Sequence, residues 1–209
     1  MKHRICGKLA ALTLVSTVLL ALPSLADEVE KPKPVNAAVA LEKDNYRVAN
    51  FVVACYSIGK AAVHGEEGVL HVSMLVRYKP FREWIAVYYD PKLITEEKLG
   101  DYLRERRCGS AKLEREESSP LTVMNRIVGI GDLVQLRISA GGTSSIKKVA
   151  LPEGWKLVGE PSGTRDSSGV TYLTVRVPAK EKFATYSILL HPNEGDPLKA
   201  EVEVVNKMR

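Results

Sequence analysis

Two cysteines, Cys55 and Cys108, are the residues of this sequence with the most specific chemistry, and they stand fifty-three positions apart. A third, Cys6, lies in the N-terminal leader described below. Cysteine thiols form disulfides, bind soft metal ions or exchange electrons as a redox pair. Each of these roles requires the fold to bring the two sulfur atoms together.

The first interpretation is a disulfide between Cys55 and Cys108. The chain begins with a predicted export signal, and neighbouring cysteines are usually oxidised outside the cytoplasm. Closing a loop of about fifty residues is worth roughly 3 to 4 kcal/mol in the chain-entropy description. A small exported domain would gain substantially from such a link.

The second interpretation is a soft-metal site with Cys55 and Cys108 as ligands. Cu(I) and Hg(II) accept two sulfur ligands. Cys55 would lie at a helix N-terminus, and Arg106 and Arg107 would add positive charge near Cys108, which favours thiolates. The third interpretation is a redox-active pair, although dedicated redox cysteines usually occur as Cys-x-x-Cys.

The segments around these cysteines are predicted to alternate between strands and helices. Residues 46–53 are rich in β-branched and aromatic side chains, and residues 55–66 have the apolar spacing of a short helix. Residues 69–76 and 84–89 alternate as strands do, and a basic turn at 77–82 joins them. These elements must position both sulfur atoms.

A second helix is expected after residue 95. Thr95 is a suitable N-cap, and Glu96 and Glu97 in the first turn favour the helix dipole. With a last short strand the order becomes βαββαβ, the order of a ferredoxin-like unit. Such a unit would carry Cys55 and Cys108 to the same end of its sheet.

Three stretches in this region form a further pattern: Gly68-Val69, Val87-Tyr88-Tyr89-Asp90-Pro91, and Ile94-Thr95-Glu96-Glu97-Lys98-Leu99. They resemble the heavy-metal-associated domains of copper chaperones, metal-pumping ATPases and periplasmic mercury-binding proteins. Cys55 stands thirteen positions before Gly68, the place of that family's second metal-binding cysteine. Val52 and Asn50 replace the first cysteine and the preceding methionine. The resemblance covers about a third of the chain and implies a ferredoxin-like fold with a degenerate Cys-x-x-Cys loop.

The chain after residue 120 reads as a series of strands. Segments such as LVQLRIS, VTYLTVRVP and KAEVEVVN alternate apolar and polar residues, and Gly, Pro, Asp and Ser separate them. Such a series suggests an antiparallel sandwich, and it resembles the immunoglobulin-like modules of bacterial exported proteins, particularly at residues 151–155. The predicted fold class is therefore an α+β ferredoxin-like βαββαβ domain followed by an all-β immunoglobulin-like sandwich.

The predicted domain organisation begins with a secretory signal peptide. Lys2, Arg4 and Lys8 precede an apolar run, and a small-x-small motif predicts cleavage between Ala26 and Asp27. An uncleaved anchor is the alternative, but the run is shorter than the ~20 residues that span a bilayer. The predicted ranges are 1–26 for the signal peptide, 27–44 for a linker, 45–116 for the heavy-metal-associated-like domain and 117–209 for the sandwich. We therefore expect a periplasmic or secreted protein without a membrane span in the mature chain.

The charge balance argues against nucleic acid as a partner. The chain has 30 basic and 25 acidic residues, a net charge of +5. Removal of the leader with its three basic residues leaves 27 basic residues and a net charge of +2. Nucleic-acid-binding domains carry a much stronger basic excess.

The function predicted from these features is that of an exported, non-enzymatic binding or assembly module of the cell envelope. No catalytic motif or spacing is present. A set of basic residues could recruit a protein partner, or could simply form a solvated surface; the set comprises Arg77, Lys79, Arg82, Arg106 and Arg107. The alternative function is binding or delivery of copper or mercury by Cys55 and Cys108.

Overall fold

The structure is a computed structural model, and it describes residues 46–106, 108, 111–118, 120–139, 146–159, 164–166 and 168–208. The predicted signal peptide and linker lie outside these described residues. Arg107, one of the predicted partner-binding residues, also lies outside them.

Both helices of the described chain lie in its first half. The elements there are β1 (Arg47–Val53), α2 (Tyr56–Val63), β2 (Val69–Tyr78), β3 (Phe81–Tyr89), α3 (Glu96–Glu105) and β4 (Lys112–Leu113). The predicted cap of the second helix is confirmed, because the Thr95 side chain accepts a hydrogen bond from the Lys98 amide at 3.3 Å. Glu96 and Glu97 follow in the first turn, where their charge complements the helix dipole.

The second half of the described chain consists of strands. They are β5 (Glu116–Ser118), β6 (Leu121–Val123), β7 (Ile127–Gly129), β8 (Leu133–Ile138), β9 (Ile146–Ala150), β10 (Lys156–Val158), β11 (Thr164–Arg165), β12 (Thr171–Arg176), β13 (Thr185–Pro192) and β14 (Leu198–Met208). In β12 the buried residues Leu173 and Val175 alternate with more exposed ones. The expectation of an all-β second half therefore agrees with the structure.

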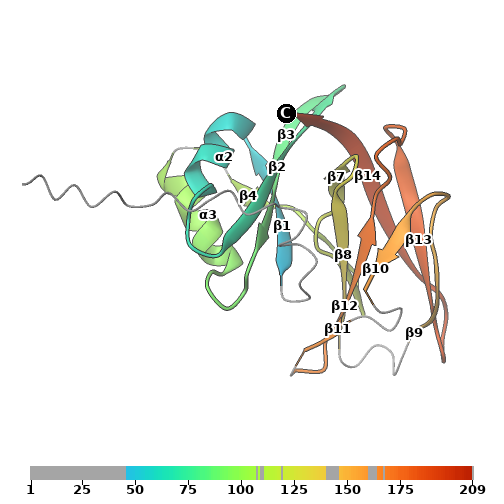
Figure 1. Cartoon of the computed structure of the whole chain (residues 1–209). Helices are drawn as coiled ribbons and strands as arrows, with labels where there is room; N and C mark the ends of the chain where they lie inside the picture. The colour runs from blue at the N-terminus through green and yellow to red at the C-terminus, as the bar shows by residue number, and fades with distance from the viewer. Residues whose placement is uncertain are drawn as a thin grey trace, which may run out of the picture. The chain divides into compact units, whose positions relative to one another are not determined.

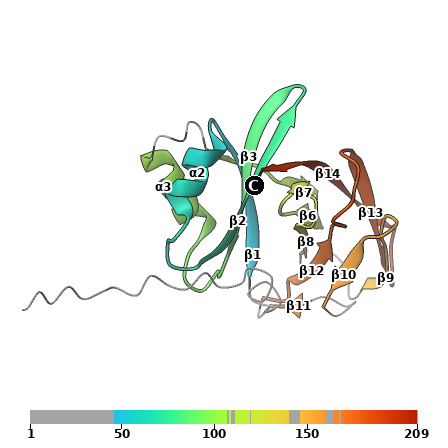
Figure 2. The ribbon, with the colours of Figure 1, turned by 45° about the horizontal axis from the view of Figure 1, so that its top comes forward.

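The strands form two sheets (Figures 1 and 2). The larger has the order β4-β1-β3-β2-β14-β13-β9, with β7 pairing in parallel with β14. The smaller has the order β10-β12-β8-β6-β5, with β11 pairing with β12. The long strand β14 connects the halves of the chain, because it pairs with β13 along residues 198–203 and with β2 along residues 206–208.

The predicted fold class is wrong. A ferredoxin-like βαββαβ domain followed by a separate sandwich would keep its first four strands in a sheet of their own. The described chain is instead mostly strand with two helices. Its larger sheet continues from the first half into the second half, because β2 pairs with β14. The reason is that β2 would otherwise present an unpaired edge, which β14 satisfies with backbone hydrogen bonds. The boundary predicted after residue 116 falls within β5, and the ranges on either side of it share the larger sheet.

The first three strands of the chain are buried on both faces. On one face, Phe51, Ile85 and Val87 pack with residues of α2 and α3. On the other face, Trp84 and Tyr88 pack against residues near the starts of β7 and β8 and against a residue in the last part of β14. A further apolar core fills the space between strands of the second half.

Candidate functional site

The two cysteine-bearing segments lie against each other. Cys55 is the residue immediately before α2, and Cys108 follows the end of α3. The amide of Ala54 donates to the carbonyl oxygen of Cys108 at 3.0 Å, and the amide of Cys108 donates to the Leu103 carbonyl at 3.1 Å. The backbone thus holds both cysteines in one small region of the chain.

Both thiols are free in the structure, and their surroundings differ. Cys108 is 1% exposed within the core beneath the helices, whereas Cys55 is half-buried. Burial raises the pKa of the Cys108 thiol, the neighbouring Cys55 raises it further, and Arg106 lowers it. Because burial is the largest influence, Cys108 is predominantly a neutral thiol near neutral pH. The arrangement brings together two thiols that could be oxidised; the disulfide itself stays a prediction.

A carboxylate that the sequence analysis did not single out lies at the same helix end. Glu83 on β3 faces Val53 on β1 in the antiparallel register. Its Oε2 atom accepts a hydrogen bond from the Tyr56 amide, the first of α2, at 2.7 Å. One of the amides that could stabilise an anionic sulfur is therefore already bound by a carboxylate. The sequence signal was a single acidic residue immediately before the apolar run of residues 84–89.

The fit of this region to a metal ion is limited. Soft metals bind the thiolate form of cysteine, and Cys108 is held in its neutral form by burial. Among the described residues, no three His, Cys, Asp or Glu side chains are grouped so that they could hold a metal ion. A Cu(I) or Hg(II) site would therefore rest on Cys55 and Cys108 alone.

The predicted basic set is divided among different surroundings. Arg77 is engaged, since its Nη1 atom donates to both carboxylate oxygens of Glu203 at 2.8 and 2.9 Å. Lys79 and Arg82 are exposed on the β2–β3 hairpin, and the Arg82 guanidinium lies 5.7 Å from the Trp84 ring centroid. Arg106 is exposed at the C-terminal end of α3. Among the four residues of this set that the structure describes, only Lys79 and Arg82 are both exposed on the same hairpin.

The tip of the β2–β3 hairpin carries two exposed aromatic side chains, and it extends beyond the neighbouring strands (Figure 2). Tyr78 and Phe81 face each other across the hairpin and are 58% and 64% exposed. Next to them lies an open cleft of about 390 Å³, lined also by Phe183, which is 58% exposed. These aromatic residues were not among the predicted site residues, although their positions beside a basic turn were a usable signal.

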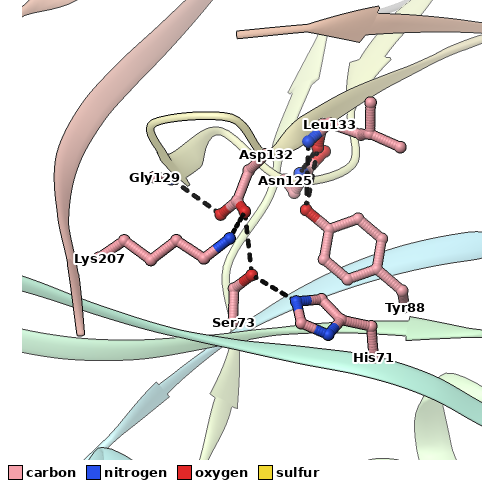
Figure 3. A network of polar contacts seen from close by, with 8 residues as sticks. All are labelled: His71, Ser73, Tyr88, Asn125, Gly129, Asp132, Leu133 and Lys207. Carbon is pink, nitrogen blue, oxygen red and sulfur yellow. Dashed lines mark hydrogen bonds and ion pairs between the residues drawn. The ribbon is translucent and has the colours of Figure 1, made fainter. Parts of the chain in front are cut away.

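A buried polar network lies elsewhere, between β2, β14 and the turn that joins β7 to β8 (Figure 3). Asp132 is at its centre, because its carboxylate accepts hydrogen bonds from the Ser73 hydroxyl and the Gly129 amide, each at 3.0 Å. The same carboxylate forms an ion pair with Lys207 of β14. The Ser73 oxygen also lies 3.2 Å from Nε2 of His71. The network fastens three segments that are distant in the sequence.

The network contains Ser, His and Asp side chains, but their order does not suit nucleophilic catalysis. A catalytic histidine stands between the serine and the acid, whereas here Ser73 stands between His71 and Asp132. The only hydroxyl proton of Ser73 is donated to Asp132, so Nε2 of His71 must donate to Ser73 and cannot accept its proton. Ser73 is also only 1% exposed, so a substrate could not reach its hydroxyl group. The network therefore has a structural role, and we call it the joint because it connects β2, β14 and the turn between β7 and β8.

A second polar group supports the same joint. Tyr88 exchanges hydrogen bonds with the backbone of Leu133, donating to its carbonyl and accepting from its amide, each at 3.3 Å (Figure 3). Asn125 donates to the same carbonyl at 2.6 Å. Burial raises the pKa of Tyr88 far above its ordinary value, and the charge of Asp132 adds to the effect. Tyr88 thus remains a neutral hydroxyl that bonds β3 to the start of β8.

In the part of the chain that the structure describes, neither helix has the length and apolar character required to cross a bilayer. Comparison with known proteins adds no relative, since no protein-family model matches the chain and no curated protein matches its sequence. The resemblance to heavy-metal-associated domains therefore stays a hypothesis, and the function has to be argued from the geometry of this chain.

Proposed function

We propose that this protein is an exported, non-enzymatic binding or assembly module of the cell envelope. The predicted signal peptide supports export, and the hairpin that carries Tyr78 and Phe81 supports binding. The observation that carries the proposal is the pairing of these two exposed aromatic side chains, opposite each other at a hairpin tip and flanked by Lys79 and Arg82.

The composition of this tip matches that of protein interfaces. Tyr, Phe and Arg are enriched at the centres of interfaces, and the residues that contribute most to affinity are aromatic residues and arginine. The two rings do little for the core, since more than half of each is exposed. Exposure of this apolar surface to water is unfavourable, so a partner that covers it would lower the free energy of the system.

Site-specific photocrosslinking tests the proposal. A photoreactive phenylalanine analogue replaces Phe81 in the full chain expressed in its source cells, and the expected result is a discrete crosslinked product with an envelope protein. The control places the same analogue at Leu93, which is 59% exposed and lies outside the hairpin. Crosslinking that is absent at position 81, or identical from both positions, would contradict the proposal.

Soft-metal binding by Cys55 and Cys108 is a second candidate function. The observation in its favour is the backbone hydrogen bond that joins the two cysteine-bearing segments. The raised pKa of Cys108 and the carboxylate of Glu83 at the helix end weigh against it. Reduced mature protein would have to take up about one Cu(I) in competition with a chromogenic chelator, and Cys55→Ser would have to abolish the uptake. Equal uptake by the serine variant would exclude Cys55 as a ligand.

A further inference from the structure

The cleft beside the hairpin lies where β14 changes partners. Pairing of β14 with β13 ends at Glu203, opposite Thr185, and pairing with β2 begins at Asn206, opposite Val76. Val204 and Val205, both buried, lie between these positions and form part of the lining. The cleft is therefore a consequence of how the sheet is assembled, and buried residues of β14 form part of its base.

The walls of this cleft are aromatic. Tyr78 lies on the hairpin side and Phe183 on the side of β13, and each is 58% exposed. The volume of about 390 Å³ is within the usual range of ligand sites, roughly 300 to 1,000 Å³. A cleft with two exposed aromatic walls is suited to one or two large apolar side chains.

The lining of the cleft carries a net positive charge. Glu203 is the acidic residue of the lining, and Arg77 neutralises it through two hydrogen bonds. Lys79 also lines the cleft and is exposed. Glu181, close in sequence to the cleft wall, keeps its negative charge, because the Trp155 ring and the Tyr186 hydroxyl that donate to it at 2.9 and 2.6 Å are neutral, and this charge offsets that of the adjacent Lys182. An occupant would thus meet aromatic walls with the cation of Lys79 beside them.

We propose that this cleft binds an acidic, extended segment of a partner protein, with an aromatic or large aliphatic side chain between Tyr78 and Phe183 and a flanking carboxylate near Lys79. The inference rests on the proposed binding function and specifies its surface and the chemistry of the partner. Charge complementarity with Lys79 selects the acidic flank, and the exposed aromatic walls select the apolar centre. One cation beside a neutralised acid does not provide the phosphate contacts that nucleic acid requires.

Selection from a phage-displayed library of random dodecapeptides on the mature protein tests this inference. The expected consensus contains Asp or Glu next to an aromatic or large aliphatic residue. A synthetic peptide of that consensus should bind the mature protein, and Phe183→Ser should weaken its binding about tenfold, equivalent to about 1.4 kcal/mol. Lys79→Glu should weaken binding similarly, and more strongly at low salt. Leu93→Ser, a change of similar exposure elsewhere, should leave it unaltered.

Several outcomes would overturn the inference: no enriched consensus, a basic consensus, or equal affinity for Phe183→Ser. Circular dichroism and a thermal melt of each variant show whether it is folded, which is expected because the replaced side chains are exposed. Dimerisation in sedimentation velocity that Phe183→Ser abolishes would assign the cleft to a second copy of the chain and would also overturn it. Failure here combined with specific crosslinking at Phe81 would leave the proposed function intact, so the two results are distinguishable.

Discussion

Oxidation of Cys55 and Cys108 is the perturbation with the largest expected effect on this protein. Their segments are already hydrogen-bonded through Ala54 and Cys108, and both thiols are free. We predict that an oxidising envelope converts them to one disulfide. In vitro the two thiols lose two protons and two electrons to oxidised glutathione, which is cleaved to two thiols in return.

The magnitude follows from the loop that the bond would close. The fifty-three positions between the cysteines include α2, β2, β3 and α3. The chain-entropy relation gives about 4 kcal/mol for a loop of this length. For a chain of this size, a change of 1 kcal/mol shifts the melting temperature by about 2–4 °C. The oxidised protein is therefore expected to melt about 8 to 16 °C above the reduced protein.

Thermal and guanidinium unfolding of the mature protein, with and without reductant, measure this difference. Cys55→Ser is the appropriate control, because Cys55 is half-buried whereas Cys108 belongs to the core and its replacement would introduce a second cost. The variant should melt near the reduced wild type and should not respond to reductant. Two titratable thiols in the unreduced, denatured protein, or a reductant that leaves the midpoint unchanged, would refute the reasoning.

The remaining predictions concern the joint and the backbone. Asp132→Asn should lower the free energy of unfolding by about 2 to 3 kcal/mol, since it removes a buried charge that bonds Lys207 and Ser73; urea unfolding measures this, and Asp101→Asn, which breaks an exposed ion pair, should change stability by less than about 1 kcal/mol. Burial and then the charge of Lys207 lower the pKa of His71 below 6.5. The unfolded chain therefore binds this proton first, so its contribution to stability is complete above pH 6.5 and is lost as the pH falls from there toward the lowered pKa; His71→Gln should flatten this part of the stability profile, and an unchanged slope would contradict the assignment. Gly68→Ala should destabilise more than Gly65→Ala in the same unfolding assay, because both glycines have positive φ but only at Gly68 would a new Cβ lie 2.8 Å from Cβ of Leu93; equal losses would show that the contact relaxes freely.

Local structure was accessible from the sequence because local patterns determine it. Thr95 with two following glutamates marks a helix start by hydrogen bonding and charge alone, and the structure confirms it. Alternation along β12 likewise follows from one buried face. Neither inference requires knowledge of distant parts of the chain.

The assembly of the sheets was not accessible in the same way. Residues 84–89 of β3 are all buried, which shows that both faces of this strand are covered. A strand covered on both faces has a continuous apolar run. The run Trp-Ile-Ala-Val-Tyr-Tyr is of this kind, whereas the sequence-based prediction there is an alternating strand. The pairing of β14 with β2 gives even less signal, because residues 206–208 are Asn, Lys and Met and their contribution is backbone hydrogen bonding.

The candidate sites show the same difference between residues that local sequence identifies and residues that only the assembled fold brings together. Cys55 and Cys108 could be identified because cysteine is rare in this chain and its chemistry is specific. Asp132 and Lys207 stand seventy-five positions apart and look like ordinary surface charges until the fold pairs them. The exposed aromatic residues of the hairpin could not be separated from core residues by type, and only their positions beside a basic turn distinguished them.

The joint and the hairpin tip are connected by the same strand. Lys207 of β14 bonds Asp132 within the joint, while Asn206 pairs with Val76, just before the hairpin residues Arg77 and Tyr78. Arg77 adds a further link through Glu203 of β14. The hairpin is thus fixed at its base by backbone pairing, an ion pair and the buried network, while its aromatic tip remains exposed. A binding surface held in this way loses little conformational entropy when a partner docks, and this preorganisation favours affinity.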